Sequence, residues 1–76
     1  MNKPRRNELK KIYDLISEEK DRLEAVKDEE EEYKDNMTEN LQGSEKYERA
    51  EEIVDNLDEA IDELDTILET IEDACE

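Results

Sequence analysis

Residues 50–76 read AEEIVDNLDEAIDELDTILETIEDACE, and this stretch decides the fold of the chain. Its apolar residues recur at steps of four and three, which is the heptad spacing of a helix that packs along one seam. The seam residues are Ala50, Val54, Leu57, Ile61, Leu64, Leu68, Ile71 and Cys75. The same stretch holds 12 Asp or Glu residues and no Lys or Arg. It therefore predicts a helix with an apolar seam and an acidic coat.

The whole chain is short and strongly acidic. It has 76 residues, half of them charged and a third hydrophobic, and a formal net charge of −16. Such a chain is repelled by nucleic acid and by anionic membranes, so we expect it to bind neither of them directly. We expect its partners to be basic proteins. A domain of this size buries little apolar surface by itself. The composition therefore favours association with a second copy or with another protein.

The cysteine content and the N-terminus indicate a cytoplasmic protein. Cys75 is the single cysteine, so no internal disulfide can form. No apolar run approaches the roughly 18 residues of a membrane-spanning helix. The N-terminal sequence MNKPRRNELKK is basic and lacks the apolar core of a signal peptide.

The order of patterned segments predicts one all-α domain over residues 1–76. We expect a first helix over about residues 4–35, a loop over 36–44 and a second helix over about 45–75. Pro4 suits the first turn of a helix, and Asn2 or Asn7 can cap it. The two helices should form an antiparallel hairpin.

The loop contains the only glycine and several capping residues. Thr38 can cap a short turn over residues 39–42, and Gly43 can end that turn. Ser44 can then cap the second helix. Two apolar residues, Met37 and Leu41, can hold the loop over the end of the hairpin.

The first helix has a weaker seam than the second. Apolar spacing places Leu9, Ile12, Ile16, Leu23, Val26 and Tyr33 on it, with Glu19 and Glu30 as interruptions. In an antiparallel hairpin the numbers of paired residues have a constant sum. A sum of 80 sets apolar against apolar at six levels. It also places the basic N-terminus beside the acidic end of the second helix, which favours this register.

A second apolar row on the second helix calls for a further packing partner. Its residues each stand one position before a seam residue: Ile53, Ala60, Ile67 and Ala74. A two-helix hairpin cannot cover so wide an apolar stripe. We expect a homodimer, in which two hairpins form an antiparallel four-helix bundle. The alternative is that this row binds a different protein.

Residues 35–73 resemble the C-terminal part of small acidic helical-hairpin proteins of phages and prophages of Gram-positive bacteria, and Tyr33 just before them also matches. Their pattern is an aromatic residue, Asp-Asn-Met, a short turn, Leu-Gln-Gly-Ser, and then a helix with Asn-Leu-Asp-x-Ala-Ile. The matching residues here are Tyr33, Asn36, Met37, Leu41, Gln42, Gly43, Ser44, Tyr47, Asn56, Leu57, Ala60 and Ile61. The resemblance covers about half of the chain. It implies a helical hairpin of mobile-element origin in a bacterial host, and it assigns no catalytic residue.

The sequence offers little for catalysis or for a cofactor. There is no His, and Cys75 has no general base beside it. We therefore expect no enzyme activity, no cofactor and no dedicated metal site. Two sets of three acidic residues at helical spacing could each hold a divalent cation loosely. One set is Asp58, Asp62 and Asp65, and the other is Asp55, Glu59 and Glu63. A solvated acidic face is the simpler interpretation of both.

The acidic coat has the charge spacing of a nucleic acid. Twelve carboxylates along about 40 Å of helix amount to one per about 3.4 Å, the axial spacing of phosphates on one DNA strand. The chain can therefore be an inhibitor that occupies the basic groove of a host nucleic-acid-binding defence protein. The expected contact residues are Glu51, Glu52, Asp55, Asp58, Glu59, Asp62, Glu63, Asp65 and Glu69. The alternative is a structural or dimerising module whose acidic face serves only solubility.

Overall fold

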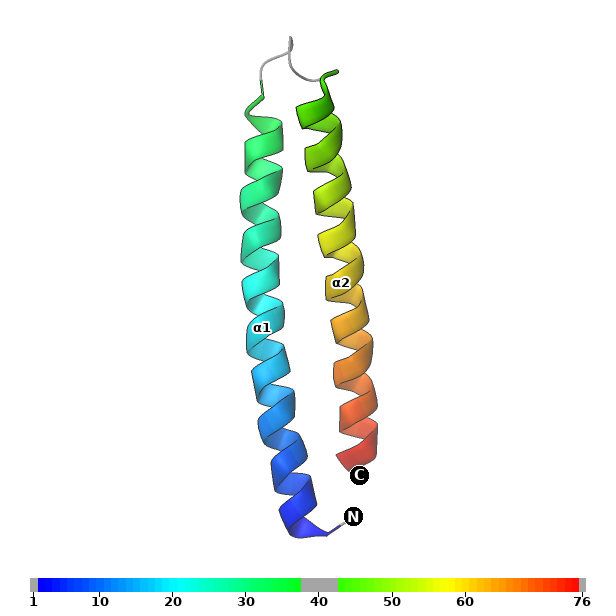
Figure 1. Ribbon diagram of the computed structural model, residues 1–76. Coiled ribbons are helices and arrows are strands. Elements are labelled where there is room, and N and C mark those ends of the chain that lie inside the picture. The colour runs from blue at the N-terminus through cyan, green and yellow to red at the C-terminus, as the bar shows by residue number, and fades with distance from the viewer. Residues whose placement is uncertain (1, 38–42, 76) are drawn as a thin grey trace.

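The computed structural model describes residues 2–37 and 43–75 and is an all-helical hairpin. Helix α1 spans Lys3–Asp35 and helix α2 spans Glu45–Cys75. The two helices run side by side in opposite directions, with both chain ends at the same end of the rod (Figure 1). The rod measures 60 × 15 × 12 Å between Cα atoms. The expected hairpin is confirmed.

Local capping explains where each helix begins. The Asn2 side chain accepts a hydrogen bond from the Arg5 N–H at 2.9 Å, and Pro4 lies in the first turn, where a missing N–H costs little. At α2, the Ser44 hydroxyl accepts a hydrogen bond from the Tyr47 N–H at 3.4 Å. Asn2, and not Asn7, is therefore the cap of α1.

The loop expectations are tested only in part. Gly43 has no positive φ, so it does not adopt the left-handed conformation in which glycine usually ends a helical turn. Met37 is buried at the loop end of the hairpin, as expected. The cap at Thr38, the turn over 39–42 and the apolar residue Leu41 lie outside the described residues.

The seam of α2 is confirmed. Four of its residues are buried, and the other four are half-buried. The buried ones are Ala50, Val54, Ile61 and Leu68, and the half-buried ones are Leu57, Leu64, Ile71 and Cys75. Heptad spacing alone located this face, because the apolar residues of α2 are concentrated on one side and the acidic residues surround them.

The expected seam of α1 is wrong at every second position. Ile12, Val26 and Tyr33 are 39%, 51% and 53% exposed, and Glu19 is exposed as well. The observed seam residues, all buried or half-buried, are Arg6, Leu9, Tyr13, Ile16, Lys20, Leu23, Lys27, Glu30, Lys34 and Met37. Lysine can lie along a seam because its alkyl chain packs while its ammonium group reaches the edge. A seam predicted from apolar residues alone leaves Lys20 and Lys27 out, so the predicted seam face of α1 is rotated from the observed one.

The expected register is wrong as well. Tyr13 contacts Glu72, Lys20 contacts Asp65 and Lys27 contacts Asp58, and each pair of numbers sums to 85. The expected sum was 80, which is five residues or about 7.5 Å along the partner helix. A sum of 80 matches apolar residues and the net charges of the helix ends, but it leaves out individual ion pairs between the helices. The observed register also brings Lys20 to Asp65 and Lys27 to Asp58 on the other helix.

Candidate interaction surfaces

One long edge of the hairpin carries a repeated ion-pair unit. Lys20 Nζ lies 3.7 Å from Glu24 Oε1 on its own helix and 2.5 Å from Asp65 Oδ1 on α2. The unit recurs one heptad later at Lys27, Glu31 and Asp58, with distances of 3.9 and 2.6 Å. Each lysine therefore bridges the two helices along the same side. We call this side the charged edge.

The charged edge holds its donors in their protonated forms. The hydrogen bond to Asp65 raises the pKa of Lys20, and the hydrogen bond to Asp58 raises the pKa of Lys27; partial burial opposes both shifts. The Tyr13 hydroxyl donates to Glu72 Oε1 at 2.8 Å, which raises the pKa of Tyr13. A lysine that acts as a nucleophile or base needs a lowered pKa. These groups therefore link the two helices, and none of the three has the lowered pKa of such a nucleophile or base.

The opposite edge is apolar on both helices. The seam residues of each helix follow one another at alternating steps of three and four. In an antiparallel pair, the residues directly before those seam residues that begin a step of three lie on the same side of the two helices. On α2 these are the expected row, Ile53, Ala60, Ile67 and Ala74, and on α1 they are Ile12, Glu19, Val26 and Tyr33. Ile67 is 45% exposed, and Leu15, one turn along α1 from Ile12, is 60% exposed. We call this side the apolar edge.

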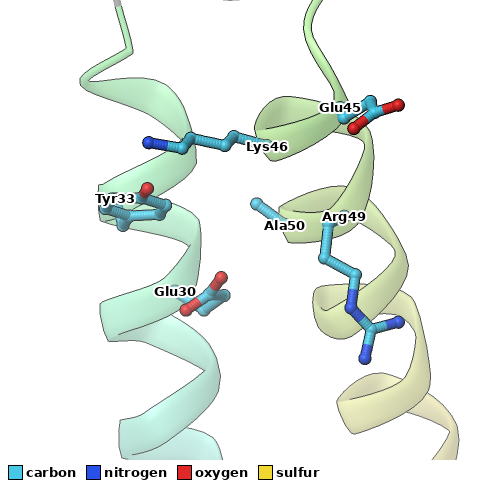
Figure 2. A pocket seen from close by; sticks show the side chains of 6 residues that line it. All are labelled: Glu30, Tyr33, Glu45, Lys46, Arg49 and Ala50. Atoms are coloured by element: carbon cyan, nitrogen blue, oxygen red, sulfur yellow. The ribbon is translucent and has the colours of Figure 1, made fainter.

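A shallow hollow near the loop end of the hairpin confirms that the two rows share an edge. It is lined by Glu30, Tyr33, Glu45, Lys46, Arg49 and Ala50. Figure 2 shows Lys46 of α2 extending across the gap to α1, where its end lies close to Tyr33, and both residues line the hollow. Lys46 stands one heptad before Ile53, so Tyr33 and the apolar row of α2 face the same side. The hollow is open and lined by both charge signs.

Sequence reasoning missed the α1 half of the apolar edge. It had assigned Ile12, Val26 and Tyr33 to the seam between the helices. A usable signal was present, because Arg6, Tyr13, Lys20, Lys27 and Lys34 recur at intervals of seven residues. A column of long amphipathic side chains with that spacing can form half of a seam when the facing helix supplies acids at the same interval. On α2 those acids are Asp58, Asp65 and Glu72.

The expected acidic contact residues do not form one surface. Asp58 and Asp65 lie on the charged edge and are paired with lysines, and Glu52 pairs with Arg49 at 3.1 Å. The other six are exposed and make no ion pair within residues 2–37 and 43–75: Glu51, Asp55, Glu59, Asp62, Glu63 and Glu69. We call these six the outer acidic face. The regular carboxylate spacing of the whole coat is therefore interrupted.

No group of three or more His, Cys, Asp or Glu side chains within residues 2–37 and 43–75 is placed to hold a metal ion. No helix in that part of the chain is long and apolar enough to cross a membrane. A second shallow hollow, lined by Lys10, Tyr13, Glu72 and Cys75, lies where the two chain ends meet.

No protein-family model, no curated protein and no solved structure matches the chain. The likeness to small acidic phage proteins therefore stays a prediction from the loop motif. The apolar edge, the charged edge and the outer acidic face are the features from which a function can be inferred.

The ion pairs of the charged edge can be tested with matched variants. We expect the double variant Asp58→Asn, Asp65→Asn to have a lower Tm than the double variant Asp55→Asn, Asp62→Asn. Both variants remove two negative charges from α2, but only the first leaves Lys20 and Lys27 without their cross-helix partners. Thermal unfolding followed by circular dichroism at low salt measures the difference. Equal Tm values would show that these pairs do not support the hairpin.

The raised pKa values predict a loss of stability in alkali. The folded-state pKa of Lys20 and Lys27 lies above 10.5 and that of Tyr13 above 10.0. A raised pKa contributes stability that is complete below the unfolded value and is lost as the pH rises through the folded value. We therefore expect the Tm to fall above about pH 10. The control is Lys20→Arg, Lys27→Arg, because arginine stays protonated there, and this variant should lose less. An equal loss in both proteins would contradict the assignment.

Proposed function

We propose that this chain is a non-catalytic protein-interaction module that pairs with a second copy through its apolar edge. The two hairpins then form an antiparallel four-helix bundle. The observation that carries the proposal is the apolar edge itself, to which both helices contribute. The resemblance to phage and prophage proteins supports a mobile-element origin and a place in the cytoplasm of a bacterial host.

The size of the apolar edge suits a dimer. A helix of 31 residues is about 46 Å long, and the hairpin is 15 Å wide between Cα atoms. Such a face covers on the order of 700 Å², close to the roughly 800 Å² that each partner contributes to a stable interface. Ile12, Val26, Tyr33 and Ile67 keep 39–53% of their surface exposed in the single hairpin. Covering them stabilises the assembly through the hydrophobic effect.

The dimer is tested by removing its apolar side chains without adding charge. We expect wild-type protein to show twice the chain mass of 9.0 kDa by light scattering at micromolar concentration. The variant Ile53→Gln, Ile67→Gln should show the mass of one chain. The control Glu59→Gln, Glu69→Gln changes the outer acidic face and should keep the wild-type mass. A monomeric wild-type protein would overturn the proposal, and so would an unchanged mass in the isoleucine variant.

A second function is favoured by the outer acidic face. Its six carboxylates have no cation beside them in the described residues, although surface helices usually mix signs to form pairs along the helix. Most of this face lies away from the apolar edge, with Glu63 at its border between Ala60 and Ile67, so a dimer displays the rest of it twice. We propose that it can occupy the basic groove of a host nucleic-acid-binding protein. The pairing of Asp58 and Asp65 with lysines makes this acidic surface narrower than the sequence indicated.

The acidic decoy function is tested by capture from a bacterial lysate. We expect immobilised wild-type protein to retain a nucleic-acid-binding protein at about 0.05 M salt and to release it at about 0.5 M, because screening weakens contacts between exposed charges. Asp55→Asn, Asp62→Asn, Glu69→Gln should abolish capture.

The matched control for this capture is Asp14→Asn, Asp21→Asn, Asp28→Asn. These three aspartates are exposed at the same heptad position on α1. The control removes the same charge and should retain the captured protein. Capture that is insensitive to salt, or equal loss with both triple variants, would contradict a specific role for the outer acidic face.

A further inference from the structure

We infer that the two copies pack with their loops at opposite ends, so that α1 lies on α1 of the second copy and α2 on its α2. The inference rests on the proposed dimer and specifies its arrangement. Two hairpins that join by the same edge around a two-fold axis have two ways to keep all neighbouring helices antiparallel. The first way is the inferred one, with the loops at opposite ends. In the second way the two loops lie at the same end of the bundle, and α2 packs on α1 of the second copy.

The sizes of the side chains on α2 favour opposite ends. The row reads Ile53, Ala60, Ile67, Ala74, alternating large and small at intervals of seven residues. When this row packs antiparallel on its own copy, Ile53 meets Ala74 and Ala60 meets Ile67, so each large side chain faces a small one. Alternation of large and small residues lets helix faces interdigitate. With loops at one end, Ile53 would instead meet the ring of Tyr33.

The one acidic residue in the α1 row favours the same arrangement. With loops at one end, Glu19 would face Ile67 on a helix surface that has no Lys or Arg from residue 50 onward. There Arg22 of its own chain is the one cation beside it, so the carboxylate is less well compensated on burial than in a site with two cations. With loops at opposite ends, Glu19 meets Val26 of the second copy, and Arg22 of that copy lies one turn from Val26. Arg22 Nη1 already bonds Glu19 within its own chain at 3.1 and 3.3 Å, so two such pairs form a compact network of four charges.

The register allows one two-fold axis to serve both helices. The α1 row, from Ile12 to Tyr33, is centred between residues 22 and 23, and the α2 row, from Ile53 to Ala74, between residues 63 and 64. The two centres sum to 86, which is within one residue, or about 1.5 Å, of the sum of 85 that the cross-helix contacts share. An axis perpendicular to the helices therefore passes close to the centres of both rows. A register sum of 80 would have separated these centres by about 9 Å.

The arrangement is tested by a distance between two spin labels. Glu45→Cys is made together with Cys75→Ser, so each chain carries one label at the exposed start of α2. With loops at opposite ends the two labels lie about 55 Å apart, because Glu45 is some 18 residues from the axis at 1.5 Å per residue. With loops at one end they lie within about 30 Å, across the diagonal of a bundle. Pulsed electron resonance measures the distance.

A second label site and the molar mass separate the outcomes. Asp62→Cys with Cys75→Ser places a label close to the axis and should give a short distance in either arrangement. A dimeric mass with the long distance at position 45 supports the inference. A dimeric mass with a short distance there, alone or mixed with the long one, overturns the inference and leaves the proposed dimer standing. A mass of one chain overturns both.

Discussion

Two lysines in the seam of α1 set the rotation of that helix and its position along α2. Lys20 and Lys27 each lie less than a quarter exposed, with the ammonium group on an aspartate of the other helix. Lysine at a seam position costs stability relative to an apolar residue, and it selects among packing arrangements. The aspartates are half exposed, so the pairs contribute modestly to the free energy of unfolding. Their main effect is to choose one arrangement of the two helices over others.

The choice has a consequence for the apolar residues of α1. With Lys20 and Lys27 in the seam, the residues just before each long seam side chain lie at the edge of the hairpin. The apolar ones are Ile12, Val26 and Tyr33. There they lie beside Ile53 and Ile67 of α2 and form a surface that the hairpin cannot cover. A seam built from Ile12, Val26 and Tyr33 would have buried more apolar area inside one chain. The exposed edge that results is the basis for the proposed pairing of two copies.

The charges are also divided between two purposes. On the charged edge, Asp58 and Asp65 hold the hairpin together through the lysines. On the outer side of α2, carboxylates such as Asp55 and Asp62 face solvent without cations and add to the self-repulsion of a chain with a net charge of −16. Asp58 and Asp65, seven positions apart, are both paired, whereas Asp55 and Asp62 make no ion pair in the described residues. A count of acidic residues along α2 cannot separate the two, because their difference depends on the facing helix.

The sequence by itself determined the two helices, the seam of α2, a cap of the first helix at Asn2 or Asn7, and the surplus apolar row at Ile53 and Ile67. Each of these depends on spacing or capping within one short segment, which is local information. Only the tertiary structure decided the rotation of α1, the register and which aspartates are paired. Lysine has an apolar stem and a charged end, so its pattern fits either a seam or a surface. The presence of Asp58 and Asp65 on the opposing helix, at matching intervals, is what resolves that ambiguity in favour of the seam.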